Sequence, residues 1–374
     1  MRDFALEVHF SRWEFAARYN LTGSDAESLS IAELLALGTP SDRRQFQELR
    51  LGYTETFGAP ALRDAIAATY DALDAEDVLC FAGAGEGIYV AMKVLLTAGD
   101  HALVMTPNYQ SAETIPLSVC DVSGVPLDEQ RGWELDIERI RAALRPNTRL
   151  LSINFPNNPT GAIPSRDAFD ALVDLCREHD LWLFSDEVYR LLELEPGRRI
   201  PQAADVYDKG ISLNVMSKAY GLPGLRVGWI GCRDRELLRR LERYKHYLSI
   251  CNSAPSELLS RIALDVRDTI LERNRRLLRD NVAHARSFFA AHDSLFEFTP
   301  PDGGCVCFVH YLGEEGVEEF TRRLVEEAGV LLLPSSIYRS EIAEVPPDHF
   351  RLGLGRSLVP AAFDAMDDWI RNRR

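Results

Sequence analysis

Short apolar segments alternate with segments of helical character between about residue 60 and residue 230, and this alternation is the strongest constraint on the fold. The apolar segments of strand length are residues 78–81, 102–105, 150–154, 181–185 and 211–215. Strands that alternate with helices are joined by right-handed crossovers, so consecutive strands run parallel in one sheet. The sequence therefore predicts an α/β fold with a mainly parallel sheet flanked by helices, one of them over residues 133–144.

A polar cluster follows each of these apolar segments. The clusters are residues 83–87, 107–109, 154–161, 186–189 and 217–226. The carboxyl ends of parallel strands meet at one edge of a sheet, and open α/β sheets bind their ligands at that edge. We therefore expect one site that combines a glycine-rich turn with Tyr, Asn, Asp, Lys and Arg side chains.

Residues 83–87, Gly-Ala-Gly-Glu-Gly, form a turn between a predicted strand and a helix predicted over residues 88–96. Backbone N–H groups can approach an anion closely in such a turn, and the helix dipole favours negative charge. The turn lacks the complete G-x-G-x-x-G spacing of dinucleotide-binding folds. Taken alone, it is compatible with a phosphate site, including that of a dinucleotide, but does not require one.

Lys218 lies just beyond the apolar segment 211–215, where Gly221 and Pro223 then impose a turn that leads to Arg226. A lysine near a desolvated site has a lowered pKa, and its amine becomes a nucleophile that can form a Schiff base. This position alone is more typical of an exposed lysine at a strand tip. The neighbouring polar clusters are what favour a reactive amine.

Composition argues against several classes of function. The formal net charge of −15 is unfavourable for a nucleic-acid-binding surface. The 7 cysteines are odd in number and lie mostly in apolar segments, which is typical of reduced thiols, and no second Cys or His pair completes a metal site. No apolar run approaches the length of a membrane span, and the first residues do not resemble a secretory signal. We expect a cytoplasmic protein without metal, nucleic-acid or membrane binding.

The pattern changes after about residue 235. A long helical tract is predicted over residues 257–291, followed by strands over residues 304–311 and 350–355. We interpret this part as a second, smaller domain. The predicted division is an N-terminal arm with part of the small domain at residues 1–40, a large domain at 41–265 and a C-terminal small domain at 266–374.

Several motifs occur in the order typical of a known enzyme family. They are Tyr53…Gly58…Leu62-Arg63, Asn154-Phe-Pro-Asn-Asn158-Pro-Thr-Gly161, Ser185-Asp186-Glu-Val-Tyr189, Ser217-Lys218-Ala-Tyr-Gly-Leu-Pro-Gly-Leu-Arg226 and Phe350-Arg351-Leu-Gly. From about residue 48 to the C-terminus the chain resembles the class I/II aminotransferases, which are pyridoxal 5′-phosphate (PLP) enzymes of fold type I. The resemblance implies PLP as cofactor and a large domain with a mainly parallel sheet beside a smaller α+β domain.

The resemblance implies a catalytic group. Lys218 would form a Schiff base with the PLP aldehyde and later act as general acid and base at the substrate Cα. Asp186 would pair with the pyridine nitrogen and keep it protonated. Tyr189 and Asn158 would hydrogen-bond the ring 3′-oxygen, although Asn158 is also explained as a loop residue fixed by its own Asn-Pro turn.

The resemblance also implies residues that hold the cofactor. Arg226 and Ser217 would bind its phosphate together with the glycine-rich turn, and Tyr109 would stack on its ring. The turn contributes Gly83, Ala84 and Gly85. Tyr53 resembles a contact that the family makes to the phosphate across a subunit interface, which implies a homodimer with shared active sites.

The resemblance further implies residues that bind the substrate. Arg351 would bind the α-carboxylate of an amino acid or 2-oxo acid through its guanidinium fork, beside Asn158. The chain departs from the family pattern at Val215, where Ser or Thr is frequent, and at residues 333–336, which lack Pro-Gly. The N-terminal arm around residues 13–24 does not match the family either. An unusual arm favours an unusual substrate.

The function that the resemblance favours is an aminotransferase that moves an amino group from an L-amino acid to a 2-oxo acid through a Lys218 Schiff base. The alternative is a PLP-dependent lyase, cyclising synthase or oxidase/deaminase of specialised amino-acid metabolism, since the same residues serve these reactions. A PLP-binding regulator would need a spare basic segment for a fused DNA-binding domain. A nicotinamide dehydrogenase would leave Lys218, Asp186 and Arg351 without roles.

Overall fold

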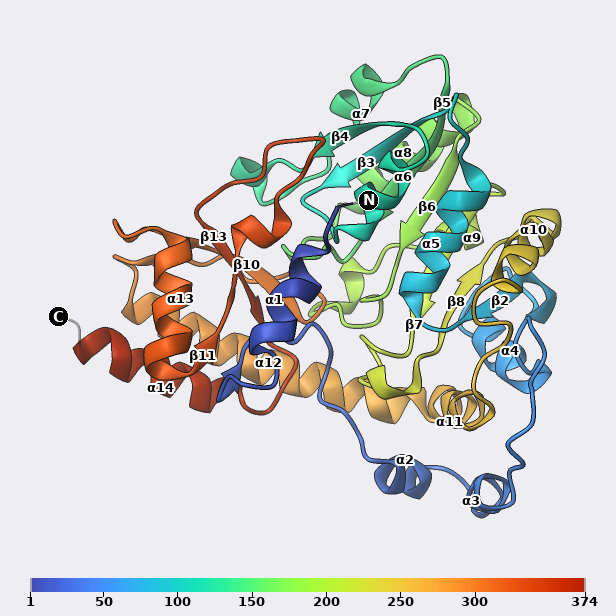
Figure 1. The fold of residues 1–374 in the computed structure, drawn as a ribbon, viewed down its shortest axis with the longest axis horizontal. Coiled ribbons are helices and arrows are strands. Elements are labelled where there is room, and N and C mark those ends of the chain that lie inside the picture. The colour runs from blue at the N-terminus through green and yellow to red at the C-terminus, as the bar shows by residue number, and fades with distance from the viewer. Residues whose placement is uncertain (1, 373–374) are drawn as a thin grey trace.

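All the strands predicted before residue 230 belong to one seven-stranded sheet in the computed structural model, which describes residues 2–372 (Figure 1). In spatial order the strands are β2 (Val78–Phe81), β8 (Gly228–Gly231), β7 (Gly210–Val215), β6 (Trp182–Asp186), β5 (Thr148–Asn154), β3 (His101–Thr106) and β4 (Asp121–Pro126). The strands from β7 to β4 run parallel, whereas β8 is antiparallel to both β7 and β2. The prediction of a mainly parallel α/β sheet is confirmed.

The sequence prediction misses β4, the edge strand. Every residue of β2 and β3 is buried, whereas in β4 only Val125 is. Strands buried on both faces have nearly continuous apolar sequences, and an edge strand need not. The mixed sequence of β4 therefore gives no apolar run from which a strand could be predicted.

Helices cover both faces of the large sheet. Leu150 on β5 packs in the core cluster that includes residues of α5 (Ala84–Leu95) and α10 (Arg235–Lys245). Its neighbour Leu151 packs in the cluster that includes residues of α7 (Ile137–Ala143) and α8 (Arg166–Glu178). Successive side chains of a strand point to opposite faces, so a strand that is apolar throughout needs helices on both sides. Other helices around this sheet are α4 (Pro60–Ala67), α6 (Ser111–Leu117) and α9 (Ala203–Val206).

Two helix predictions in this part are corrected at their starts. The predicted helix 133–144 begins only at Ile137, because Trp133 has a φ of 67° and Asp136 caps the helix by accepting from the N–H groups of Glu138 and Arg139. The helix predicted from Ile88 instead begins at Ala84, so the glycine-rich turn supplies its first turn.

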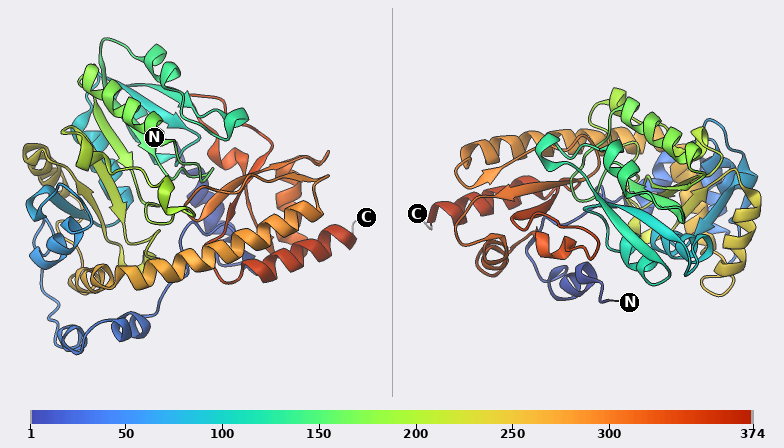
Figure 2. Two further views of the ribbon diagram at one scale, coloured as in Figure 1. Left: turned by 180° about the vertical axis from the view of Figure 1, so that it is seen from behind. Right: turned by 90° about the horizontal axis from the view of Figure 1, so that it is seen from above.

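A second, antiparallel sheet follows in the C-terminal part. Its order is β12 (Leu333–Pro334), β13 (His349–Gly353), β10 (Val306–Tyr311) and β9 (Phe296–Glu297). The helical tract predicted over residues 257–291 is two helices, α11 (Ala254–Asp265) and α12 (Arg267–Ala291), separated at Val266. Figure 2 shows α12 running from beside the large sheet to the small one. Our division of the chain into domains at residues 40 and 265 stays a prediction.

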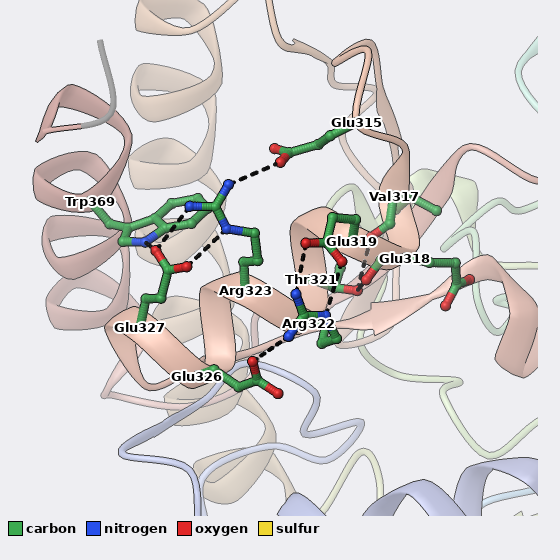
Figure 3. A network of polar contacts seen from close by, with 10 residues as sticks. All are labelled: Glu315, Val317, Glu318, Glu319, Thr321, Arg322, Arg323, Glu326, Glu327 and Trp369. Atoms are coloured by element: carbon green, nitrogen blue, oxygen red, sulfur yellow. Dashed lines mark hydrogen bonds and ion pairs between the residues drawn. The ribbon is translucent and has the colours of Figure 1, made fainter.

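Helices α13 (Val317–Ala328) and α14 (Val359–Asn372) pack on each other beside the small sheet. Figure 3 shows polar contacts of α13, in which Arg323 bridges to Glu327 at 2.8 Å within the helix and the Trp369 indole N–H of α14 donates to the same carboxylate at 2.9 Å. Arg322 pairs with Glu319 at 2.7 Å. Such exposed pairs contribute little individually, so apolar packing carries most of the contact between the two helices.

The N-terminal arm begins between the two sheets, and its later helices lie against α11 (Figure 1). It contains α1 (Ala5–Trp13), then β1 (Tyr19–Asn20), which pairs in parallel with β11 (Val330–Leu331), then α2 (Ile31–Leu37) and α3 (Pro40–Gln47). The Gly353 N–H donates to the Leu21 carbonyl at 2.6 Å, and the Ala26 N–H donates to the Lys218 carbonyl at 3.3 Å. The arm is therefore held against β13 and against the loop after β7. In the described part of the chain, no helix is long and apolar enough to cross a membrane.

Candidate active site

The predicted site residues gather in one cavity at the carboxyl edge of the large sheet. Its volume is about 370 Å³. All of the predicted residues except Gly83 and Tyr53 line it: Ala84, Gly85, Tyr109, Asn158, Asp186, Tyr189, Ser217, Lys218, Arg226 and Arg351. Most of them lie on loops that leave the parallel strands, as the strand-end argument predicts. Arg351 instead comes from β13 of the small sheet.

Lys218 follows β7, and its amine lies inside the cavity. Lys218 Nζ donates to Ser24 Oγ at 2.7 Å and lies 5.9 Å from the centre of the Tyr189 ring. Loss of water around the amine lowers the pKa of Lys218, and the nearby carboxylates of Asp25 and Asp186 oppose this effect only in part. A lysine with a lowered pKa has more of the neutral, nucleophilic amine near neutral pH.

Asp186 ends β6 and faces the same cavity. The Val188 N–H donates to Asp186 Oδ1 at 3.2 Å. Burial raises the pKa of Asp186 to about 6, and the hydrogen bond from Val188 and the charge of Lys218 offset only part of that rise. A buried carboxylate with a raised pKa is stabilised when a cationic group binds beside it.

Tyr189 and Asn158 form one wall. Tyr189 is 1% exposed, and its hydroxyl has no hydrogen-bond partner within residues 2–372. Because buried hydroxyl groups are nearly always hydrogen-bonded, this one indicates a missing partner. The amide oxygen of Asn158 accepts from Arg351 Nη1 at 3.1 Å and from the Tyr338 hydroxyl at 3.3 Å. Its backbone N–H donates to the Asn154 side chain at 2.8 Å, so the loop itself also fixes its position.

Arg226 and the first turn of α5 form an anion-binding corner. A Cβ at Gly83 would lie 2.6 Å from Arg226 Nη2, so only glycine allows the guanidinium to lie so close. Gly83 has a φ of 91° and precedes the helix, whose first backbone N–H groups have no partner within the helix. Free N–H groups beside a guanidinium are suited to a phosphate. Ser217 is buried and lines the same cavity.

The two tyrosines predicted for the cofactor differ in position. Tyr109 lines the cavity, and its ring centre lies 5.2 Å from that of Phe4 at the start of the arm. Tyr53 is 93% exposed and does not line the cavity of its own chain. The single chain therefore brings Tyr109 to the site but not Tyr53.

Arg351 is a buried cation without an anionic partner. It is 0% exposed, and Nη2 donates to the Thr22 carbonyl at 2.6 Å. Its Nε has no hydrogen-bond partner, and no carboxylate pairs with it in the part of the chain that the structure describes. An uncompensated buried charge is costly, so this guanidinium is suited to an anionic ligand.

The sequence prediction misses the residues that the arm contributes. Ser24 accepts from Lys218, and Asp25 pairs with Arg356 at 2.8 Å. Glu7 and Glu14, on and just after α1, also line the cavity. The only sign of them in the sequence is that the arm departs from the family pattern.

The comparisons with known proteins match this geometry. The family described as aminotransferase class I and II matches residues 33–358. The chain belongs to that family. An arginine–pyruvate transaminase of Pseudomonas aeruginosa is 31% identical over 319 residues, covering 81% of this chain and 77% of the relative. A capreomycidine synthase of Streptomyces vinaceus is 28% identical over 326 residues, covering 87% and 83%. A PLP-dependent aminotransferase of Streptococcus suis superposes with a TM-score of 0.92 at 30% identity, covering 99% and 98% of the two chains.

Membership of this PLP-dependent family makes pyridoxal 5′-phosphate the cofactor of the protein. The residues of the cavity fit that group. The Tyr189 hydroxyl, without a partner in residues 2–372, offers a hydrogen bond to an oxygen. The raised pKa of Asp186 favours a cationic neighbour, and the corner at Gly83 and Arg226 suits a phosphate.

Proposed function

We propose that this aminotransferase-family protein moves the amino group of an L-amino acid to a 2-oxo acid. The observation that carries the proposal is that Lys218 and Arg351 line the same cavity. Lys218 is a desolvated amine with a lowered pKa, and Arg351 is a buried guanidinium without a carboxylate partner among the described residues. An amino acid suits this arrangement, because Arg351 can bind its carboxylate while Lys218 accepts the proton from its Cα.

We assign the proton transfer at the substrate Cα to Lys218 Nζ. PLP, when bound, supplies an electron sink for the electrons that deprotonation leaves at Cα. The lowered pKa of Lys218 brings the amine closer to the pH at which general base catalysis is efficient. Ser24 Oγ, 2.7 Å away, holds the amine in place. Arg351, with Asn158 beside it, would hold the substrate carboxylate and so orient Cα toward Lys218.

The remaining cavity residues would bind the cofactor. Asp186 would pair with the ring nitrogen, and Tyr189 and Asn158 would donate to the ring oxygen. Arg226, Ser217 and the first turn of α5 at Gly83, Ala84 and Gly85 would hold the phosphate, while Tyr109 would cover the ring. The geometry that supports these assignments is the convergence of these groups on one cavity, together with the Tyr189 hydroxyl and the glycine at position 83.

We also propose that the active unit is a homodimer. Exposed large apolar residues occur in two segments that lie together, because the Thr54 hydroxyl donates to the Asn252 carbonyl at 3.0 Å. The exposed residues of this patch are Leu51, Tyr53, Tyr247, Leu248 and Ile250. A second copy that covers them would bring its Tyr53 to the phosphate of the first.

Mixed dimers of the Tyr53→Ala and Lys218→Ala variants should then be more active than the two parents together. A monomeric, fully active protein would contradict the proposal.

A cyclising synthase is the second candidate. It is favoured by the 28% identity to a capreomycidine synthase and by the arm residues that line the cavity. Lys218, Asp186 and Arg351 would have the same tasks in both reactions, because both begin with proton removal at Cα. The two candidates differ in whether the amino group stays on the cofactor.

The test is a titration of PLP-loaded protein with L-amino acids in the absence of a 2-oxo acid. An aminotransferase replaces the absorbance band of the lysine-bound cofactor with a pyridoxamine-type band and releases a stoichiometric amount of 2-oxo acid. A cyclising synthase consumes the amino acid, forms a cyclic product and keeps the original band. If neither reaction occurs with any of the amino acids tested, the proposed function is wrong.

A further inference from the structure

Helix α1 lies between the large and the small sheet (Figure 1), and its residues Leu6, Glu7 and Phe10 line the cavity. On the large-sheet side, the Ala5 N–H donates to the Gln110 side chain at 2.9 Å, and Gln110 Nε2 donates to the Asp3 carbonyl at 2.7 Å. Leu6 is buried in the core cluster of that side. On the small-sheet side, the chain continues into β1, which pairs with β11. The helix is therefore fixed at both ends over the site.

Two carboxylates of this segment face the cavity without a partner. Glu7, Phe10 and Glu14 all line it, and their spacing of three and four residues is that of one helix face. Neither Glu7 nor Glu14 makes a side-chain hydrogen bond or an ion pair with any residue between 2 and 372. Burial and the charges of Glu7 and Asp25 raise the pKa of Glu14, and the charge of Arg356 opposes this rise only in part.

The other charges of the cavity have partners or assigned ligands. Arg356 is neutralised by Asp25, with contacts of 2.8, 3.0 and 3.1 Å. Under the proposed function, Arg226 meets the phosphate, Arg351 meets the substrate carboxylate and Asp186 meets the ring nitrogen. Once these charges are matched, Arg356 acts on Glu14 only at a distance, and neither Glu7 nor Glu14 forms an ion pair among residues 2–372.

A second observation shows that a polar ligand belongs in this cavity. Arg351 Nε and the Tyr189 hydroxyl are buried polar atoms that line it and have no partner among residues 2–372. The acidic pair at the mouth and these two atoms therefore belong to one binding site. Arg351 lies at its buried end and Glu7, which is exposed, at its open end.

We propose that the amino-acid substrate carries a cationic side chain, a guanidinium or an ammonium, and that Glu7 and Glu14 bind this cation at the mouth of the cavity. This inference rests on the proposed function, because it assumes that Arg351 holds the carboxylate at the other end. A guanidinium can share its donors between two carboxylates. An acidic side chain would meet like charge there, and that repulsion gives specificity against it.

The test compares L-arginine with L-citrulline, which has nearly the same shape but no side-chain charge. PLP-loaded protein is titrated with each, and the apparent Kd is taken from the change in the cofactor spectrum. We expect arginine to bind about tenfold or more tightly, the effect of one charge-assisted hydrogen bond. The preference should shrink with added salt, since the pair is partly solvated. L-Glutamate should bind more weakly than citrulline.

The variant is the double substitution Glu7→Gln and Glu14→Gln, which keeps side-chain size and removes both charges. We expect the ratio of the citrulline Kd to the arginine Kd to fall to about one. The control is Glu314→Gln with Glu344→Gln, which removes two exposed charges that do not line the cavity, and it should leave the ratio unchanged.

Three results would overturn the inference. They are equal affinity for arginine and citrulline in the parent protein, tighter binding of glutamate, and a preference for arginine that persists in the Glu7→Gln, Glu14→Gln protein. In these cases amino acids still change the cofactor spectrum, so the proposed function stands. If no amino acid changes the spectrum, the proposed function fails and the inference fails with it.

Discussion

Two sides of the active-site cavity differ in how far their residues can be predicted. The strand-end side consists of Asn158, Asp186, Tyr189, Lys218 and Arg226, which lie on loops after the parallel strands. The arm side consists of Glu7, Glu14, Ser24, Asp25 and Arg356. Every residue of the strand-end side belongs to a short motif that follows an apolar segment. No residue of the arm side does.

The difference is one of sequence separation. Asp186 is the last residue of its strand, so the strand and the polar residue are part of the same local pattern. The contact between Lys218 and Ser24 joins residues 194 positions apart, and that between Arg356 and Asp25 joins residues 331 positions apart. No periodicity or turn signal covers such distances. Under the proposed function, the strand-end side binds the cofactor and the arm side meets the substrate.

The largest effect is expected beside strand β2, where a buried lysine joins the segments around residues 56 and 252 to the large sheet. Lys245 is fully buried and donates to the carbonyls of Thr56 and Cys80 at 2.6 and 2.7 Å and to Asn252 at 3.0 Å. Lys245→Met leaves these acceptors buried without a donor and should lower the free energy of unfolding by about 3 kcal/mol. Urea unfolding of the apoprotein measures this loss, and the control is Lys209→Met, which removes a partly buried lysine that pairs with the exposed Asp180. A loss below about 1 kcal/mol is within the range of an ordinary surface pair and would contradict the stabilising role given to Lys245.

The next effect concerns Arg351, which contacts residues on both sides of the cavity. Arg351 contacts Asn158 on one side and the Thr22 carbonyl of the arm on the other. Arg351→Lys keeps the charge but loses the planar fork, so the apparent Kd for the amino acid should rise about hundredfold. The absorbance spectrum of the bound cofactor should stay unchanged. A changed cofactor spectrum with unchanged affinity would instead place Arg351 with the cofactor.

A pH effect tests the strand-end side without substrate. Burial raises the pKa of Asp186 from 3.8 to about 6, so between these values the folded apoprotein holds a proton that the unfolded chain has lost. The free energy of unfolding should therefore fall as pH rises through this range. Asp186→Asn should remove the fall and stabilise the apoprotein at pH 7 by about 2 kcal/mol. With PLP bound to the parent protein, a cation beside the Asp186 carboxylate should also suppress this fall in the free energy of unfolding.

The smallest effect concerns the arm side. Ser24→Ala removes the acceptor for Lys218 Nζ and should slow conversion of a bound amino acid about fivefold, the contribution of one ordinary hydrogen bond. Because Ser24 positions the amine, the rate should fall more than the affinity, and the pH profile of the rate should shift. Ser24→Thr should restore most of the rate. An equal loss in Ser24→Thr and Ser24→Ala, or a change in affinity alone, would show that the arm only packs here.

Much of the fold could be predicted from the sequence. The central strands are mostly apolar and buried because helices cover both faces, and this gives a clear signal at residues 150–154 and 211–215. Strand β4, with its exposed edge, gives none. The start of α7 was misplaced because the left-handed conformation of Trp133 has no local signature.

The candidate site divides in the same way. The motifs around Lys218 and Asp186 predict the cavity and its cofactor, and Arg351 was placed by its match to the family. The exposed Tyr53 lies outside the cavity of its own chain, so the role proposed for it requires a second subunit. Ser24 and the acidic residues of the arm could not be found, because their positions are set by packing between distant segments.

The most direct test of the account is to locate the cofactor on the chain. The only lysines in the sequence are Lys93, Lys209, Lys218 and Lys245. PLP-loaded protein is reduced with borohydride, digested and mapped by mass spectrometry. We predict that the reduced cofactor is found on the peptide that contains Lys218 and is absent from the Lys218→Ala protein. Attachment to another lysine, or none to Lys218, would contradict the account.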